Sequence, residues 1–228
     1  MREFIKNELL GWKKSEVIWL VISVSIILAL SIYWKENVIG IISSITGILC
    51  VVLVGKGKMS SYIFGLINTS LYAFIAFSSK FYGDAMLNAF YYVPMQFIGW
   101  VMWKKKISAK NYEVEKERLT IKENFIYLSI TSIIIIIYGF ILSKLGGRLP
   151  YIDSISTCLS ILAMIFTVKR LMEQWVLWII INAVSIYMWV DTFIQNQSDV
   201  ATLLMWIVYF INSVIMLIKW IKDTKPND

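Results

Sequence analysis

The side chains best suited to chemistry in this chain are aromatic and amide groups inside one strongly apolar stretch, residues 173–191. At about 100° per residue of an α-helix, Trp175, Trp178, Asn182, Ser185 and Trp189 fall on one face, and the opposite face is almost entirely Ile, Leu and Val. An amide at the centre of a membrane helix is unfavourable unless it meets a partner or a polar cavity. The stripe therefore predicts a pocket that stacks a ring on tryptophan and hydrogen-bonds its edge.

Further amides and a phenol are expected at similar depth in other apolar stretches. They are Asn68 in residues 59–79, Asn88, Tyr92 and Gln96 in residues 85–103, and Asn212 in residues 199–220. A cavity of neutral amides, hydroxyls and aromatic rings suits a polar, ring-containing solute better than an inorganic ion. The alternative is that such amides only join helices, at roughly 1 kcal/mol each. We favour that alternative for any single Asn, and binding for the Trp175–Trp178–Asn182 stripe.

The elements that must position these side chains are membrane-spanning helices. Hydrophobic residues make up 58% of the 228-residue chain and charged residues 16%, against about 25% charged in typical soluble domains. Apolar stretches long enough to cross a bilayer, which needs roughly 17–25 residues, are expected at 16–34, 38–55, 59–79, 85–103, 123–144, 150–168, 173–191 and 199–220. The chain is therefore predicted to be an all-α polytopic membrane protein with no room for a soluble catalytic domain.

The basic residues orient these spans. The chain has 22 Lys and Arg residues. If the N-terminus is cytoplasmic, all of them fall on the cytoplasmic side except Lys35, Lys80, Lys144 and Arg148. This asymmetry follows the positive-inside rule and predicts that both termini are cytoplasmic. The net charge of +7 thus orients the protein in the lipid bilayer, and no nucleic-acid partner is expected.

Groups that would support catalysis or ion coupling are scarce. The chain has no histidine, which removes the commonest proton shuttle and the commonest metal ligand. Asp84, Asp153 and Asp199 fall in expected first helical turns, where a carboxylate stabilises exposed amides, and no carboxylate is expected deeper in a span. We therefore expect no catalytic residue, no metal and no cofactor, and passive movement of a solute.

The spans divide as one, three, one and three. Residues 1–37 form a cytoplasmic tail and an extra N-terminal helix, 38–103 a first three-helix bundle, 104–149 a basic loop and a linker helix, 150–220 a second bundle, and 221–228 a tail. Because the linker helix returns the chain to its starting side, the two bundles insert in the same orientation, as in parallel-repeat transporters with a site between the halves. Asn68 and Asn182 occupy corresponding positions of the two bundles. Pro94, in the middle of its span, predicts a kink.

Several local motifs resemble those of one transporter family. They are Tyr62-Ile-Phe-Gly65-Leu-Ile-Asn68, Tyr82-Gly83-Asp84, Leu87-Asn88, Tyr91-Tyr92-Val-Pro94, Gly99-x-x-x-Trp103, Asp153-Ser154 and Trp175-x-x-Trp178-x-x-x-Asn182. At these positions, over about residues 38–220, the chain is similar to the PnuC family of nicotinamide riboside transporters. The resemblance implies a SWEET-like fold of two three-helix bundles joined by one linker helix, with an N-terminal helix that not every member has.

The resemblance also implies a substrate. In that family the Trp-x-x-Trp pattern is associated with nicotinamide riboside, and relatives for thiamine or riboflavin alter it. It implies substrate contacts from Trp175, Trp178, Asn182, Asn88 and Gln96, while Asn68, Tyr92 and Asn212 rest on helical geometry. It further implies passive transport across the inner membrane, with a separate cytosolic kinase trapping the vitamin.

Three other interpretations stay open at this point. The first is a transporter of thiamine or riboflavin, the second a membrane-embedded enzyme, and the third a membrane scaffold without a ligand. The sequence is compatible with a homo-oligomer and does not determine the number of subunits.

Overall fold

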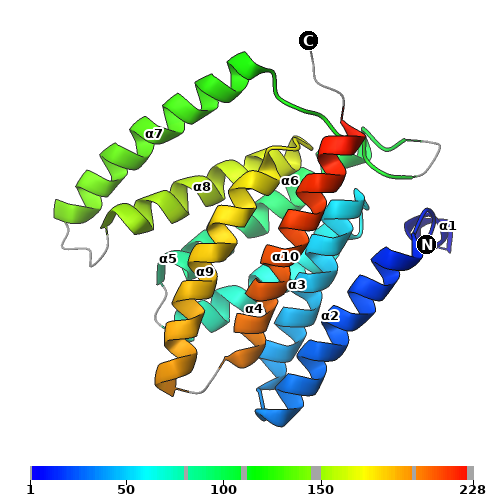
Figure 1. Cartoon of the computed structure of the whole chain (residues 1–228), viewed down its shortest axis with the longest axis horizontal. Helices are drawn as coiled ribbons and strands as arrows, with labels where there is room; N and C mark the ends of the chain where they lie inside the picture. The colour runs from blue at the N-terminus through cyan, green and yellow to red at the C-terminus, as the bar shows by residue number, and fades with distance from the viewer. Residues whose placement is uncertain (1, 80–81, 109–111, 145–149, 197–198, 225–228) are drawn as a thin grey trace.

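The computed structural model describes residues 2–79, 82–108, 112–144, 150–196 and 199–224 (Figure 1). The part of the chain that it describes is almost entirely helical. In chain order the elements are α1 (Arg2–Glu8), α2 (Lys14–Tyr33), α3 (Val38–Lys56), α4 (Ser61–Ser78), α5 (Tyr82–Met86), the π-helix η1 (Leu87–Tyr92), α6 (Val93–Lys104), α7 (Ile121–Lys144), α8 (Pro150–Val168), α9 (Gln174–Asn196) and α10 (Val200–Asp223).

Within these described residues, seven helices are long and apolar enough to cross a membrane, namely α2, α3, α4, α7, α8, α9 and α10. Their bounds follow the expected spans closely, and the predicted all-α polytopic class is confirmed. The remaining expected span, 85–103, which is the fourth along the chain, is divided into α5, η1 and α6. The helix α1 is a difference from the prediction, because its residues are expected from the sequence to belong to a tail.

Pro94 explains the division of this fourth span. Proline has no amide hydrogen and crowds the preceding turn, so the regular helical hydrogen bonding is interrupted there. Just before it, the Val93 amide donates to the carbonyl of Asn88, five residues earlier, in the pattern of a π-helix. The predicted kink thus takes the form of a π-helical segment that carries Asn88 and Tyr92.

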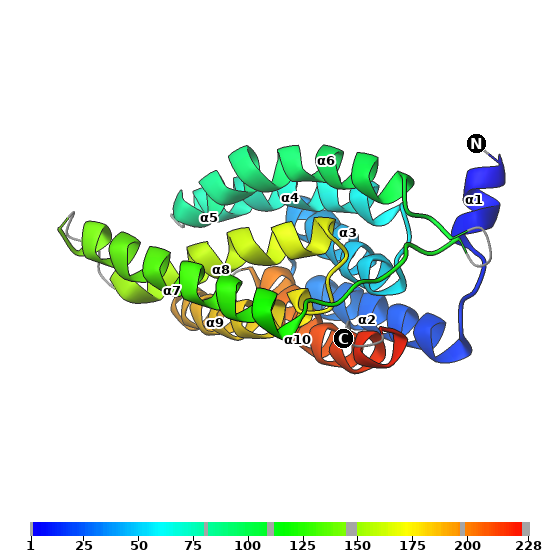
Figure 2. The ribbon, with the colours of Figure 1, turned by 90° about the horizontal axis from the view of Figure 1, so that it is seen from above.

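Six segments form a closed ring. The helix α3 packs on α4, α4 on η1 and α6, α6 on α8, α8 on α9, α9 on α10, and α10 back on α3. The α3–α10 and α6–α8 contacts are seams between the segments 38–103 and 150–220, which is consistent with the predicted bundles. Outside the ring, α2 packs over the α3–α10 seam and α7 packs on α8, on opposite sides of the molecule (Figures 1 and 2).

Local sequence sets several helix ends. The Asn37 side chain accepts from the Gly40 amide at 2.7 Å and caps α3. Thr120 and Glu123 form a reciprocal capping box before α7, with amide-to-side-chain distances of 2.8 and 3.2 Å. Gly57 ends α3 with a φ of 77°, a left-handed conformation that favours glycine.

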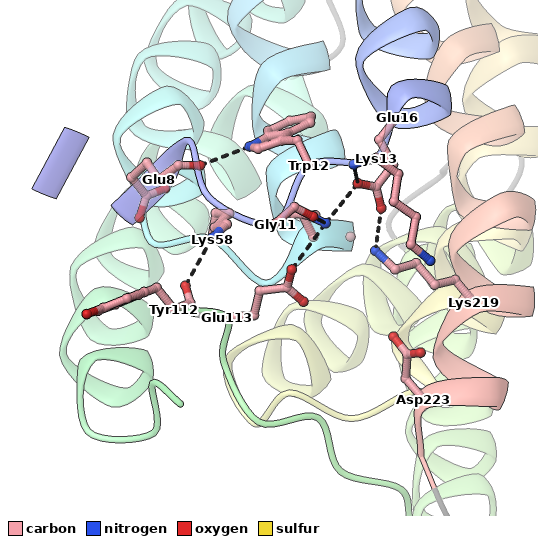
Figure 3. A network of polar contacts seen from close by, with 12 residues as sticks. Glu8, Gly11, Trp12, Lys13, Glu16, Lys58, Tyr112, Glu113, Lys219 and Asp223 are labelled. Carbon is pink, nitrogen blue, oxygen red and sulfur yellow. Dashed lines mark hydrogen bonds and ion pairs between the residues drawn. The ribbon is translucent and has the colours of Figure 1, made fainter. Parts of the chain in front are cut away.

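At one end of the ring, α1 and the segment that carries Tyr112 and Glu113 lie beside Lys58, in the turn after α3 (Figure 3). The buried Lys58 Nζ donates to the carbonyls of Asn7 at 3.0 Å and Tyr112 at 3.4 Å. Lys116 pairs with Asp223 at the end of α10. The two ends of the described chain therefore lie on the same side of the helical ring.

Candidate functional site

A cavity of about 120 Å³ lies inside the ring, far larger than the roughly 10–15 Å³ that one water requires. Every segment of the ring contributes to its wall, and none of the described lining residues carries a charge. The wall consists of Cys50, Val51 and Val54 from α3, Tyr62, Gly65, Asn68, Thr69 and Tyr72 from α4, Asn88, Tyr92 and Gln96 from η1 and α6, Met164 and Thr167 from α8, Trp175, Trp178 and Asn182 from α9, and Met205, Trp206, Tyr209 and Ser213 from α10.

The structure brings all but one of the predicted site residues to this cavity. Trp175, Trp178, Asn182, Asn88, Gln96, Asn68 and Tyr92 line it. Asn212 does not: it is fully buried, and its Nδ2 donates to the Val51 carbonyl at 3.2 Å, which joins α10 to α3. The helix-joining interpretation therefore describes the placement of Asn212. Contact between the other seven and a ligand stays a prediction.

The predicted face of α9 is largely buried, with Trp178 half-buried. Trp175, Asn182 and Ser185 are buried, whereas Val176 and Ile180 on the other side are exposed. Trp189, at the far end of this face, is also buried but does not line the cavity. Its Nε1 donates to Tyr72 Oη at 3.0 Å and so connects α9 to α4.

The two tryptophans near the start of α9 have different surroundings. Trp178 lies 6.3 Å from Tyr92 between ring centroids, with planes at 55°, and its Nε1 donates to Thr167 Oγ1 at 3.1 Å. Trp175 packs edge-on against Trp220, with centroids 5.8 Å apart. Its Nε1 is buried and has no hydrogen-bond partner among the described residues. Both indoles therefore border the cavity, but only that of Trp178 is held by a hydrogen bond.

The side-chain amides of the site differ in which of their atoms lack a hydrogen-bond partner in the protein and could bind a ligand. Both polar side-chain atoms of Asn68 have hydrogen-bond partners. Its Nδ2 donates to the Ser43 carbonyl at 2.9 Å, and its Oδ1 accepts from Tyr209 Oη at 3.3 Å. Asn182 Nδ2 donates to Ser213 at 2.9 Å, while its buried Oδ1 has no partner within the described chain. An acceptor buried without a partner is unfavourable, so Asn182 presents a ready acceptor for a polar ligand.

Gln96 and Asn88 come from the broken span. Asn88 Nδ2 donates to the Asp84 carbonyl at 2.9 Å. The Gln96 side chain is buried, and its amide makes no hydrogen bond to the described residues of the protein. It fits beside Gly65, where a Cβ would lie 2.5 Å from Gln96 Oε1. The glycine in α4 thus leaves the space that the Gln96 amide occupies at the cavity wall.

The other end of the cavity is aromatic too, which the sequence analysis did not predict as a site. Trp206 lies 5.7 Å from Tyr72 and 5.3 Å from Tyr209 between ring centroids, in edge-on packing. The i, i+3, i+7 spacing of Trp206, Tyr209 and Ser213 on α10 could have indicated this face. Asp84 lies in the first turn of α5, as predicted, and its carboxylate also accepts from Tyr72 Oη at 3.1 Å.

Comparison with known proteins identifies the family. A family described as nicotinamide mononucleotide transporter matches residues 37–222. The nicotinamide riboside transporter PnuC of Neisseria mucosa is 37% identical over 226 residues, covering 96% of this chain and 86% of the relative. The chain belongs to the PnuC transporter family. PnuC of Haemophilus influenzae is 35% identical, covering 94% of this chain and 93% of the relative.

A solved PnuC structure has the same fold. The crystal structure of the vitamin B3 transporter PnuC superposes with a TM-score of 0.88 at 36% identity and covers 97% of each chain. As a PnuC family member, the chain is a multi-pass membrane transporter and not an enzyme. The resemblance inferred from local motifs is confirmed.

Proposed function

We propose that this protein carries nicotinamide riboside across the inner membrane by facilitated diffusion. The observation that supports it most directly is the uncharged, aromatic cavity at the centre of the ring. Relatives of the chain are named as transporters of this compound, and the Trp175–Trp178–Asn182 pattern lines the cavity.

The cavity wall favours the riboside over the mononucleotide for which the matching family is named. The mononucleotide carries a phosphate with a charge of about −1.5 to −2 near neutral pH, and a buried anion requires a cationic partner or many donors. No Lys or Arg lies among the described lining residues. The riboside carries a cationic pyridinium ring instead, and a cation over an indole face gains roughly 0.5–2 kcal/mol.

The partners of each side chain suggest how the substrate is held. We propose that the pyridinium ring stacks on Trp178 or Trp175, and that Asn182 Oδ1 accepts from the carboxamide or from a ribose hydroxyl. The side-chain amide of Gln96 can both donate to and accept from the substrate, because it makes no hydrogen bond to the described residues of the protein. Asn88, Asn68 and Tyr92 complete the wall, while Asn212 holds α10 against α3.

Passive transport accords with the same cavity. Proton coupling would require a titratable group that meets the substrate pathway with a pKa near neutrality, and the described wall contains no carboxylate, Lys or Arg. We further propose that the end of the ring carrying both chain ends faces the cytoplasm, as the basic residues predict. A separate cytosolic kinase would then phosphorylate the riboside and maintain the inward gradient.

Binding and uptake by the purified protein test this function. We expect titration calorimetry to detect nicotinamide riboside, with the mononucleotide bound at least about 100-fold more weakly because its phosphate is unpaired. Proteoliposomes should accumulate labelled riboside to the external concentration only, and the compound should be recovered chemically unchanged. Unlabelled thiamine and riboflavin serve as competitors. Equal binding of riboside and mononucleotide, or stronger competition by either vitamin, would overturn the assignment.

A further inference from the structure

We propose that Thr167 is a positioning residue that fixes the indole of Trp178 for the transported ring. This inference rests on the proposed function, because it assigns a role to Thr167 in holding a cationic ring substrate. Thr167 lies one residue before the end of α8, and Trp178 lies in the second turn of α9. Both side chains line the cavity.

The hydroxyl of Thr167 is held by its own helix. Thr167 Oγ1 donates to the Ala163 carbonyl at 2.9 Å, four residues earlier. A hydroxyl has one hydrogen and two acceptor lone pairs, so its remaining capacity is as an acceptor. Trp178 Nε1 uses that capacity at 3.1 Å. The direction of the hydrogen bond between the two side chains is therefore fixed.

This hydrogen bond determines which side of the indole faces the cavity. An indole has a single donor and no acceptor, and rotation about its χ2 angle would move Nε1 away from Thr167. Tyr92 borders the same indole, with centroids 6.3 Å apart and planes inclined at 55°. With Nε1 held by Thr167, the ring face remains available for stacking, and Trp178 needs no hydrogen bond from the ligand.

The backbone of Thr167 has a separate role at the seam between the halves. Its carbonyl accepts from Nε1 of the fully buried Trp103 of α6 at 3.1 Å. Trp103 in turn packs edge-on against Tyr62, with centroids 5.1 Å apart. A change of the Thr167 side chain leaves this backbone contact in place, so the hydroxyl can be tested without removing the contact between α6 and α8.

Isosteric substitution isolates the hydroxyl. Thr167→Val keeps the shape and removes the acceptor, so we expect the affinity for nicotinamide riboside, measured by calorimetry, to fall roughly three- to tenfold. Thr167→Ser keeps the acceptor and should restore affinity close to that of the unaltered protein. Thr46→Val is the matched control: Thr46 Oγ1 also donates to a carbonyl four residues earlier, at 2.7 Å, and Thr46 does not line the cavity.

A double-mutant cycle separates positioning from direct contact. Trp178→Phe keeps an aromatic face but has no N–H, so the Thr167 hydroxyl can no longer act through this ring. If Thr167 acts through Trp178, adding Thr167→Val to Trp178→Phe should not weaken binding further. If the loss caused by Thr167→Val persists in the Trp178→Phe protein, Thr167 contacts the ligand itself and the proposal is wrong.

The outcomes also distinguish this inference from the function on which it rests. If the unaltered protein does not bind the riboside, the proposed function fails. If it binds and Thr167→Val binds equally well, only the positioning role fails. Thermal unfolding in detergent checks that each variant is folded, and a loss of affinity in Thr46→Val as large as that in Thr167→Val would also overturn the proposal.

Discussion

The carboxylate of Glu16 on α2 lies 2.8 Å from the ammonium of Lys56, in the last turn of α3. Its other oxygen lies 2.9 Å from Lys219 Nζ on α10 (Figure 3). One carboxylate therefore joins the two halves of the ring at the seam over which α2 packs. The side chains of Glu16 and Lys56 are only 12% and 4% exposed, so solvent screens this interaction weakly.

Replacement of Glu16 by Gln should destabilise the protein. Removing one member of a buried ion pair leaves its partner uncompensated, which costs about 3–5 kcal/mol when nothing else is near. Lys56 keeps Glu113 at 3.1 Å, so we expect the free energy of unfolding in detergent to fall by only about 1–3 kcal/mol. Asp191 is exposed, and Asp191→Asn is the control. We expect that substitution to change the free energy of unfolding by less than about 0.5 kcal/mol. Equal stability of Glu16→Gln and the unaltered protein would show that the bridge contributes nothing.

Loss of both cavity tryptophans should greatly reduce transport. In Trp175→Ala/Trp178→Ala the cationic ring loses its stacking surfaces, and uptake into proteoliposomes should fall about 10- to 100-fold. Trp34→Ala is the matched control, because Trp34 is 39% exposed and packs on Phe193 away from the cavity. Wild-type uptake by the double variant would contradict the proposed site.

A methyl group at Gly65 should displace the Gln96 amide. The new Cβ would lie 2.5 Å from Gln96 Oε1 and 3.0 Å from Cys50 Sγ, so the amide must turn or shift along the cavity wall. We expect Gly65→Ala to weaken riboside binding by roughly tenfold, with a smaller effect on thermal stability because a flexible side chain yields. At Gly40 the atoms nearest to a Cβ belong to the flexible Glu36 side chain, at 3.1 Å and beyond, and Gly40→Ala should bind normally. Unchanged affinity of Gly65→Ala would exclude Gln96 as a contact.

Stability at alkaline pH should depend on Lys58. Burial, the largest effect, lowers the pKa of Lys58 below its ordinary value of 10.5, although Glu113 and Glu8 oppose the shift. Between the folded and unfolded pKa values the unfolded chain binds more protons, so this residue makes stability rise with pH in that window.

The variant Lys58→Met should remove that contribution. Thermal unfolding in detergent, followed from pH 7 upwards, should show a more positive slope of Tm against pH for the unaltered protein than for Lys58→Met. Parallel slopes would mean that Lys58 titrates alike in the folded and unfolded protein. The comparison with Lys58→Met is needed because the other lysines and the tyrosines of the chain also titrate at alkaline pH.

Much of the architecture follows from local sequence. The span lengths come from runs of apolar residues, because each backbone polar group in lipid must be satisfied within its own helix. The buried face of α9 follows from the spacing of Trp175, Trp178 and Asn182, since helical periodicity alone puts them together. The kink near Pro94 follows from the missing amide hydrogen.

Contacts between distant segments could not be predicted in this way. Asn68 and Asn212 both lie mid-span, yet Asn68 borders the cavity and Asn212 joins α10 to α3. Their helices have the same kind of polar stripe, and which part of it faces the cavity depends on how α3, α4 and α10 rotate against each other. Trp206 became part of the site for the same reason.

The sequence by itself determined the class of the protein, the depth of its polar groups and the family to which it belongs. These properties depend on composition, periodicity and local motifs, which act over a few helical turns. Only the tertiary structure decided that six segments close a ring, that Gln96 fits beside Gly65, and that the Thr167 hydroxyl holds Trp178. Such pairings join residues far apart in the chain, and they depend on the packing of whole helices rather than on any one of them.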